Sequence, residues 1–160
     1  MTKIFLSRPN TCDPVYNSTV KALTDFLKKR GLTPITIGST VFPNKTPIEA
    51  VKEEMQSCSG IIILGLPQIL IENGIQKKNT KVEQIIIDKE SPSVWNQIEG
   101  AMAFMLGLPI LIIAQEGIND GLFETGTLPF FKHEYNLRSS HWIERQKFHD
   151  PFNEWYKELR

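Results

Sequence analysis

Apolar runs alternate with amphipathic stretches along most of this chain. The predicted strands cover residues 4–7, 33–37, 61–64 and 108–113, and the predicted helices cover residues 20–30, 46–59 and 95–104. Two of the strand runs, Ile61–Leu64 and Leu108–Ile113, contain no charged position, which is typical of strands buried on both faces of a parallel sheet. The alternation of strands and helices therefore predicts an α/β fold with a mostly parallel central sheet of about five strands and helices on both faces.

The remaining segments have weaker patterns. Residues 69–90 contain Asn73-Gly74, a turn signal, and Ile85–Ile87 fits an extra strand. The apolar pattern predicts a last edge strand at residues 130–137 and a C-terminal helix at residues 151–159. The sequence shows no repeat, low-complexity tract or linker, so we expect residues 1–160 to form a single domain.

Composition narrows the classes of function. Lys and Arg total 18, and Asp and Glu also total 18, so a basic excess that would favour nucleic acid or an anionic membrane is missing. Cys12 and Cys58 lie in no Cys/His cluster, and no metal site is expected. The opening residues enter a strand pattern directly, and there is no long apolar segment, so we expect a cytoplasmic protein that does not span a membrane.

A ligand site in such a sheet is expected at the carboxyl ends of the strands. The loops concerned are residues 7–13, 38–45, 65–68 and 115–119, and the segment 91–99 should reach the same edge. The sequence has no dinucleotide-binding glycine fingerprint, no P-loop and no nucleophile elbow. The three histidines all fall in the C-terminal part, away from this edge, and are poor candidates for a catalytic or metal-binding role.

Glu99 is the best candidate for a catalytic group. It lies on the first or second turn of an otherwise apolar helix, where a buried charge is costly unless a polar group meets it. A single carboxylate can hold ribose hydroxyls or stabilise the cationic C1′ that forms as a base leaves. One carboxylate suffices if the base departs without help, as nicotinamide does. The alternative is that Glu99 caps its helix or pairs with a nearby Arg or Lys.

Several neighbours could bind a substrate beside Glu99. The candidates are Ser7, Arg8, Leu66, Pro67, Trp95 and Asn96. The planar guanidinium of Arg8 could bind a diphosphate through two hydrogen bonds, although an ordinary surface role fits equally well. Trp95 offers a flat surface for stacking a base or sugar, or it is a core residue ahead of the helix. Asn96 either bonds a ligand or caps the helix, and capping is favoured.

Four segments together resemble the Toll/interleukin-1 receptor-like (TIR-like) nucleotide-binding domains and the related nucleoside 2-deoxyribosyltransferase-like proteins. They are Lys3–Ser7, Ile48–Cys58 with the following Gly60–Gly65, Ser91–Ala101 and Pro109–Ile113. The resemblance implies a flavodoxin-like three-layer sandwich and cleavage of an N-glycosidic bond, with Glu99 at the position of the family's catalytic glutamate. The chain departs from the TIR pattern at Arg8-Pro9-Asn10, where acidic residues are usual.

The resemblance also implies a function and partners. TIR-like members cleave NAD, as substrate rather than cofactor, to nicotinamide and ADP-ribose or a cyclic isomer, and several act in bacterial antiviral defence or signalling after oligomerising. We therefore expect an NAD-cleaving glycosidase that forms a homo-oligomer and responds to a separate sensor protein. The enzymatic alternatives are a nucleoside 2-deoxyribosyltransferase or a nucleotide N-glycosidase. A further alternative is a non-catalytic nucleotide-binding or protein-interaction module.

Overall fold

A five-stranded parallel sheet forms the centre of the protein. The computed structural model describes residues 2–159. The strands of this sheet are β1 (Thr2–Ser7), β2 (Leu32–Ile35), β3 (Ile61–Gly65), β6 (Ile110–Gln115) and β7 (Lys132–Tyr135). They run in the order β2-β1-β3-β6-β7, and all neighbouring pairs are parallel. The predicted sheet of about five strands is confirmed, and the fold is a flavodoxin-like three-layer sandwich.

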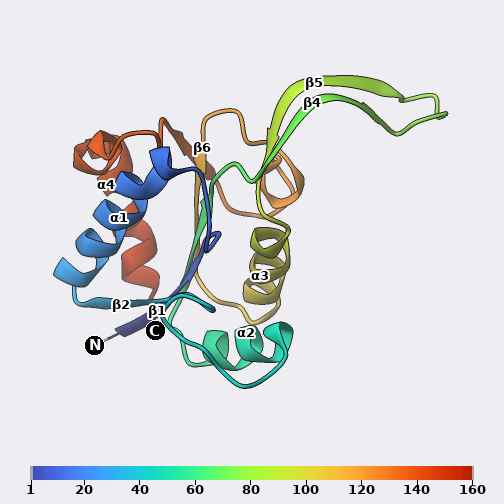
Figure 1. Ribbon diagram of the computed structural model, residues 1–160. Helices are drawn as coiled ribbons and strands as arrows, with labels where there is room; N and C mark the ends of the chain where they lie inside the picture. Colours follow the sequence, from blue (N-terminus) through green and yellow to red (C-terminus); the bar gives the residue numbers. More distant parts are fainter. Residues whose placement is uncertain (1, 160) are drawn as a thin grey trace.

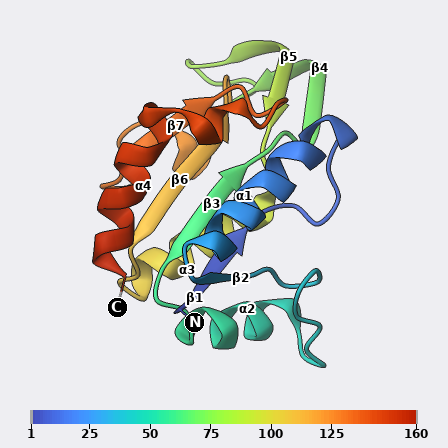
Figure 2. The same ribbon diagram turned by 90° about the vertical axis from the view of Figure 1, so that its left-hand side faces the viewer.

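Helices cover both faces of the sheet, as predicted (Figures 1 and 2). The α-helices of the described residues are α1 (Asn17–Lys29), α2 (Pro47–Gln56), α3 (Val94–Met105) and α4 (Gln146–Glu158). One apolar cluster packs α1 and α4 on one face, and a second packs α2 and α3 on the other. β3 contributes to both clusters because Ile62 and Leu64 point to one face, whereas Ile61 and Ile63 point to the other.

The connection from β6 to β7 contains no α-helix. It passes through the short 3-10 helix η2 (Gly121–Phe123), whose Phe123 ring is fully buried. A Cβ atom placed on Gly65 would lie 2.5 Å from that ring, so the glycine is what allows the ring to lie directly on β3. The side chains of this connection thus take the place of a helix over β3 and β6.

Residues 69–91 form an antiparallel hairpin outside the central sheet, which we call the arm. Its strands are β4 (Ile69–Gln76) and β5 (Gln84–Ser91). The extra strand predicted at Ile85–Ile87 is therefore present. The prediction of a turn at Asn73-Gly74 is wrong, because both residues lie within β4 and pair with β5. The chain reverses farther on, between the strands, where Lys77 and Asn79 have positive φ angles.

The C-terminal helix begins earlier than predicted. α4 starts at Gln146, and Pro151 lies inside it instead of at its first position. Because proline has no N–H, the carbonyl of Lys147 loses its helical partner. The Tyr135 hydroxyl donates to this carbonyl at 2.9 Å and compensates for the loss. The edge strand predicted at residues 130–137 is confirmed as β7.

Candidate functional site

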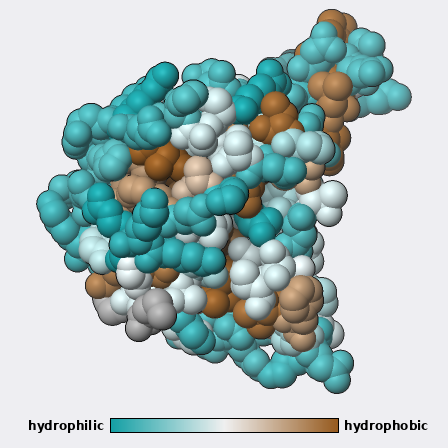
Figure 3. All heavy atoms as spheres, turned by 60° about the vertical axis from the view of Figure 1, so that its left-hand side comes forward, coloured by the Kyte–Doolittle hydropathy of each residue, from teal (hydrophilic) through white to brown (hydrophobic). Residues whose placement is uncertain are grey.

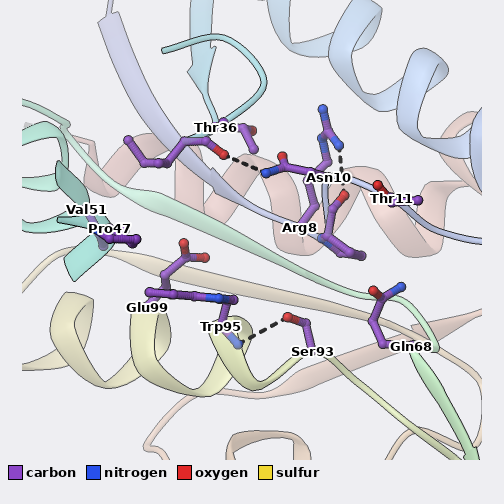
Figure 4. Close-up of a pocket in the computed structure, with 13 residues that line it drawn as sticks. Arg8, Asn10, Thr11, Thr36, Pro47, Val51, Gln68, Ser93, Trp95 and Glu99 are labelled. Atoms are coloured by element: carbon purple, nitrogen blue, oxygen red, sulfur yellow. Dashed lines mark hydrogen bonds between the residues drawn. The ribbon is translucent and has the colours of Figure 1, made fainter. Parts of the chain in front are cut away.

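A cavity of about 440 Å³ opens at the carboxyl ends of β1, β2 and β3 (Figure 4). Its walls come from the loops after these three strands, from the start of α2 and from the first two turns of α3. The lining residues are Arg8, Pro9, Asn10, Thr11, Thr36, Ile37, Gly38, Pro47, Val51, Gln68, Ser93, Trp95 and Glu99. This is the edge of the sheet at which the strand order predicts a ligand.

Glu99 reaches this cavity from the second turn of α3. The helix begins after Ser93, whose hydroxyl accepts from the Trp95 N–H at 3.1 Å, so Ser93 is the helix cap. Figure 4 shows the Glu99 carboxylate pointing into the cavity beside the Trp95 ring. The side chain is only 7% exposed, and no Lys or Arg among residues 2–159 forms an ion pair with it. Neither structural alternative for Glu99, capping or an ion pair, is therefore found.

Burial sets the protonation of Glu99. Loss of solvent raises the pKa of its carboxyl to about 7, and a hydrogen bond with Ser7 acts in the opposite direction. Near neutral pH the group therefore exists both as an acid and as a carboxylate. Perturbed carboxyl groups of this kind, in a cavity and without a counter-charge, are typical of functional sites.

Ser7 and Asn96 hold Glu99 from behind. The Asn96 amide donates to the Ser7 hydroxyl at 2.9 Å and to the Ser7 carbonyl at 3.3 Å. Since that hydroxyl accepts from Asn96, its own hydrogen is free for the Glu99 carboxylate. Both residues are almost completely buried, and neither lines the cavity. Ser93, and not Asn96, is the helix cap.

Arg8 and Trp95 line the cavity, as predicted. Trp95 is partly exposed and forms one wall, which is the arrangement that stacking on a ring requires. Arg8 donates to the Pro9 carbonyl at 2.9 Å and to the Ser39 hydroxyl at 2.8 Å, and its guanidinium points away from Glu99 in Figure 4. Burial lowers the pKa of Arg8 from its usual value. An anion that Arg8 binds would lie at the opposite side of the cavity from Glu99.

Leu66 and Pro67 do not reach this cavity. Leu66 is fully buried in the core beneath α1 and α4. Pro67 lines a separate hollow with Cys12, Asp13 and Tyr16. The loop after β3 instead presents the next residue, Gln68, to the cavity.

Sequence reasoning missed several wall residues. Asn10 and Gly38 lie in loops already assigned to this edge, and their contact is close: a Cβ atom on Gly38 would lie 2.6 Å from Asn10 Nδ2. Asn10 donates to the Ile37 carbonyl at 2.9 Å and so joins the loops after β1 and β2. Pro47 and Val51 were missed because the α2 pattern reads as a core-facing helix, and no signal in that pattern marks a cavity wall.

Two further observations concern metals and membranes. No three His, Cys, Asp or Glu side chains among residues 2–159 are grouped so that they could hold a metal ion. No helix in the same range is long and apolar enough to cross a membrane.

Comparisons with known proteins identified no similar protein. No protein-family model matches the chain, and no curated protein and no solved structure is significantly similar to it. The candidate function therefore rests on the residues of the cavity and on the resemblance of the Ser91–Ala101 segment.

Proposed function

We propose that this protein cleaves an N-glycosidic bond at C1′ of a ribosyl nucleotide, with NAD as the substrate and Glu99 as the catalytic carboxylate. One observation carries the proposal: Glu99 is buried in the cavity, unpaired with any cation of residues 2–159, and has a raised pKa. A carboxylate with no structural partner is suited to a cationic centre that is present only during reaction.

The cavity supplies one acidic group, and this favours a particular leaving group. Glu99 is the only Asp or Glu among its lining residues. A single carboxyl cannot be the anion that faces C1′ and, at the same time, the acid that protonates a departing base. Nicotinamide in NAD already carries a positive charge and needs no proton, whereas a neutral purine or pyrimidine usually does. NAD is therefore favoured over an ordinary nucleoside.

The reaction balances without another group. The bond from C1′ to the nicotinamide nitrogen breaks, and its electron pair neutralises the pyridinium. The carboxylate of Glu99 stabilises the oxocarbenium ion that remains. A water oxygen then bonds to C1′ and releases one proton, giving ADP-ribose. Approach of the cationic nicotinamide ring favours the ionised form of Glu99 and lowers its pKa, while Ser7 fixes the orientation of the carboxylate.

Incubation of the pure protein with NAD, with nicotinamide measured by chromatography, tests this proposal. Glu99→Gln keeps the shape of the side chain but removes its charge, and we expect the rate to fall by at least about 100-fold. The control is Glu116→Gln, which changes an exposed carboxylate after β6, outside the cavity, and should leave the rate unchanged. Nicotinamide release that survives in Glu99→Gln would refute the role of Glu99.

Two parallel assays identify the alternatives. Release of free base from deoxynucleosides, without release of nicotinamide from NAD, would select the deoxyribosyltransferase. No release from either substrate at high protein concentration, together with binding of NAD to the cavity, would select the non-catalytic nucleotide-binding module.

A further inference from the structure

The strand pairing and one break in it define the two faces of the arm. In an antiparallel pair, residues directly opposite each other lie on the same face. The pairs Ile75↔Ile85 and Asn73↔Ile87 therefore share one face, and Gly74↔Ile86 lies on the other. The alternation breaks at Asp88, which has a positive φ of 50°, and a Cβ atom on Gly74 would lie 3.1 Å from the Ile71 methyl, so Ile71 shares the face of Gly74. The face that carries Leu70, Ile75, Ile85 and Ile87 is called the isoleucine face below.

No part of residues 2–159 covers the isoleucine face. Leu70, Ile75, Ile85 and Ile87 are 59%, 54%, 77% and 64% exposed. The arm extends beyond the sheet in Figures 1 and 2, and Figure 3 shows hydrophobic side chains along it at the upper right. A two-stranded hairpin is only marginally stable in water, and an apolar face of this length normally packs against something.

The base of the arm is fixed, so its direction is defined. Asp120 forms an ion pair with Lys89 and accepts a hydrogen bond from the Ser91 hydroxyl. Arg138 forms an ion pair with Glu90 at 3.5 Å. The arm therefore projects in a set orientation from the edge of the sheet, on the side that α3 covers (Figure 1).

The outer side of α3 is a second uncovered apolar surface. Val94, Ile98, Ala101 and Met105 follow one another at helical spacing, and Val94 and Met105 are 64% and 82% exposed. This set is called the α3 stripe below. Apart from Glu99, which points inward, α3 carries no charged residue. The exposed Phe104 and Leu106 extend the apolar surface at its end.

We propose that these two surfaces bind each other between two copies of the chain, with the isoleucine face of each arm lying on the α3 stripe of the other copy. Neither surface carries an unpaired charge that could attract a charged partner. Both are apolar, so each can bury the other. A two-fold arrangement forms the contact twice and closes the assembly as a dimer. The proposal does not depend on the proposed function.

Length and area agree with this pairing. Eight-residue strands span about 26 Å, and the twelve residues of α3 span about 18 Å, so an arm can cover the whole stripe. The exposed apolar side chains of both surfaces are together comparable with the roughly 800 Å² that each partner contributes to a stable interface.

Dimer formation would also affect the cavity. Gln68 immediately precedes β4, Ser93 follows β5, and both line the cavity with Trp95. An arm bound to a second copy therefore restrains Gln68 and Ser93 in the cavity wall. The same contact restrains α3, which carries Glu99. Any activity of this cavity should rise with protein concentration in the range where the dimer forms.

Light scattering coupled to size-exclusion chromatography, on the full chain at about 1 to 100 µM, tests the interface. The wild type should be a dimer at the upper concentrations. Ile85→Glu with Ile87→Glu on the arm, and separately Met105→Glu on α3, should each weaken the dimer at least tenfold. The matched controls are Ile69→Glu, on the opposite face of the same arm and 52% exposed, and Phe42→Glu, in an exposed loop; both should remain dimeric.

Mixing the arm variant with the α3 variant identifies the pairing. A mixed dimer retains one intact contact, between the normal arm of one chain and the normal α3 of the other, so dimer should partly return. Arm-to-arm or α3-to-α3 contact predicts no recovery and would overturn the proposal. So would a monomeric wild type at 100 µM, or a wild type that stays monomeric and sediments with anionic lipid vesicles through the arm. Unchanged circular dichroism of the variants would exclude unfolding as the cause.

Discussion

The chain contains the tripeptide Ile-Ile-Ile at residues 61–63 and again at residues 85–87, and the two copies lie in opposite environments. The first is completely buried in β3, between helices on both faces. The second lies in β5 of the arm, where Ile85 and Ile87 are mostly exposed. Identical local sequence therefore forms strands in both places, but burial depends on the neighbours that the rest of the chain supplies.

The flanking residues explain the difference. Gly60 and Gly65 bound the first copy, and their lack of a side chain lets neighbouring residues approach closely: a Cβ on either would lie 2.5 Å from a packed side chain. Polar residues, Gln84 and the run Asp88-Lys89-Glu90, bound the second. Close packing is possible around the first and not around the second, so only the first belongs to the core.

The largest difference should come from deleting the same side chain in each copy. Ile63→Ala leaves a cavity between β3 and α3 and should reduce the free energy of unfolding by about 3 kcal/mol. Ile87→Ala should change it by less than about 0.5 kcal/mol when the chain is monomeric. Urea denaturation at low protein concentration measures both, and equal losses would show that the arm is packed against the body.

Glu99 gives the next largest effect. Its pKa is about 7 in the folded protein against a usual 4.5, so the folded state holds a proton that the unfolded state loses between these pH values. Stability should therefore fall as pH rises from 4.5 to 7, by up to about 3 kcal/mol, and level off above. Thermal melts across this range should show the decline in the wild type but not in Glu99→Gln. The control is Glu72→Gln on the exposed arm, whose stability should depend on pH in the same way as that of the wild type.

Two glycines compare close packing in the body and in the arm. Gly65→Ala places a methyl group 2.5 Å from the Phe123 ring and should cost about 2 kcal/mol. Gly74→Ala meets only the Ile71 methyl at 3.1 Å, in the exposed arm, and should change stability by less than about 0.5 kcal/mol. Thermal unfolding measures both variants, and a large loss in Gly74→Ala would contradict an uncovered arm.

The smallest effect concerns the base of the arm. Asp120→Asn weakens the contacts with Lys89 and Ser91 and should cost about 1 kcal/mol. Hydrogen exchange should become faster in residues 69–91 and remain unchanged in β1, β3 and β6. Uniformly faster exchange would mean that the arm and the body open together.

The elements that could be predicted are those whose formation depends on residues close together in the sequence. β1, β3 and β6 were found because a strand covered on both faces needs an uninterrupted apolar run. The location of Glu99 followed from chain order, which brings the start of α3 to the carboxyl ends of the strands. Asn73-Gly74 misled because an exposed strand outside the core tolerates residues that usually form turns. Pro151 misled because its effect on α4 is offset by Tyr135, which is distant in sequence.

Side-chain direction limited the prediction of the cavity. Leu66 and Gln68 belong to the same loop, but only Gln68 faces the cavity. β3 ends at Gly65, so strand alternation no longer fixes the direction of the side chains that follow. The hydrogen bonds from Asn96 to Ser7 join residues 89 positions apart, and no sequence pattern reports a contact of that kind. The catalytic candidate was therefore identified more readily than the residues that position it.

The two ends of the arm lie next to each other, because the Gln68 N–H donates to the Ser91 carbonyl at 2.8 Å. A segment with adjoining ends is an insertion that the surrounding fold does not need for its connectivity. Replacing residues 69–91 by a short link would leave an ordinary strand–helix crossover from β3 to α3. The connectivity of the body accordingly does not depend on the arm, and a change in the length of the arm would leave the central sheet continuous.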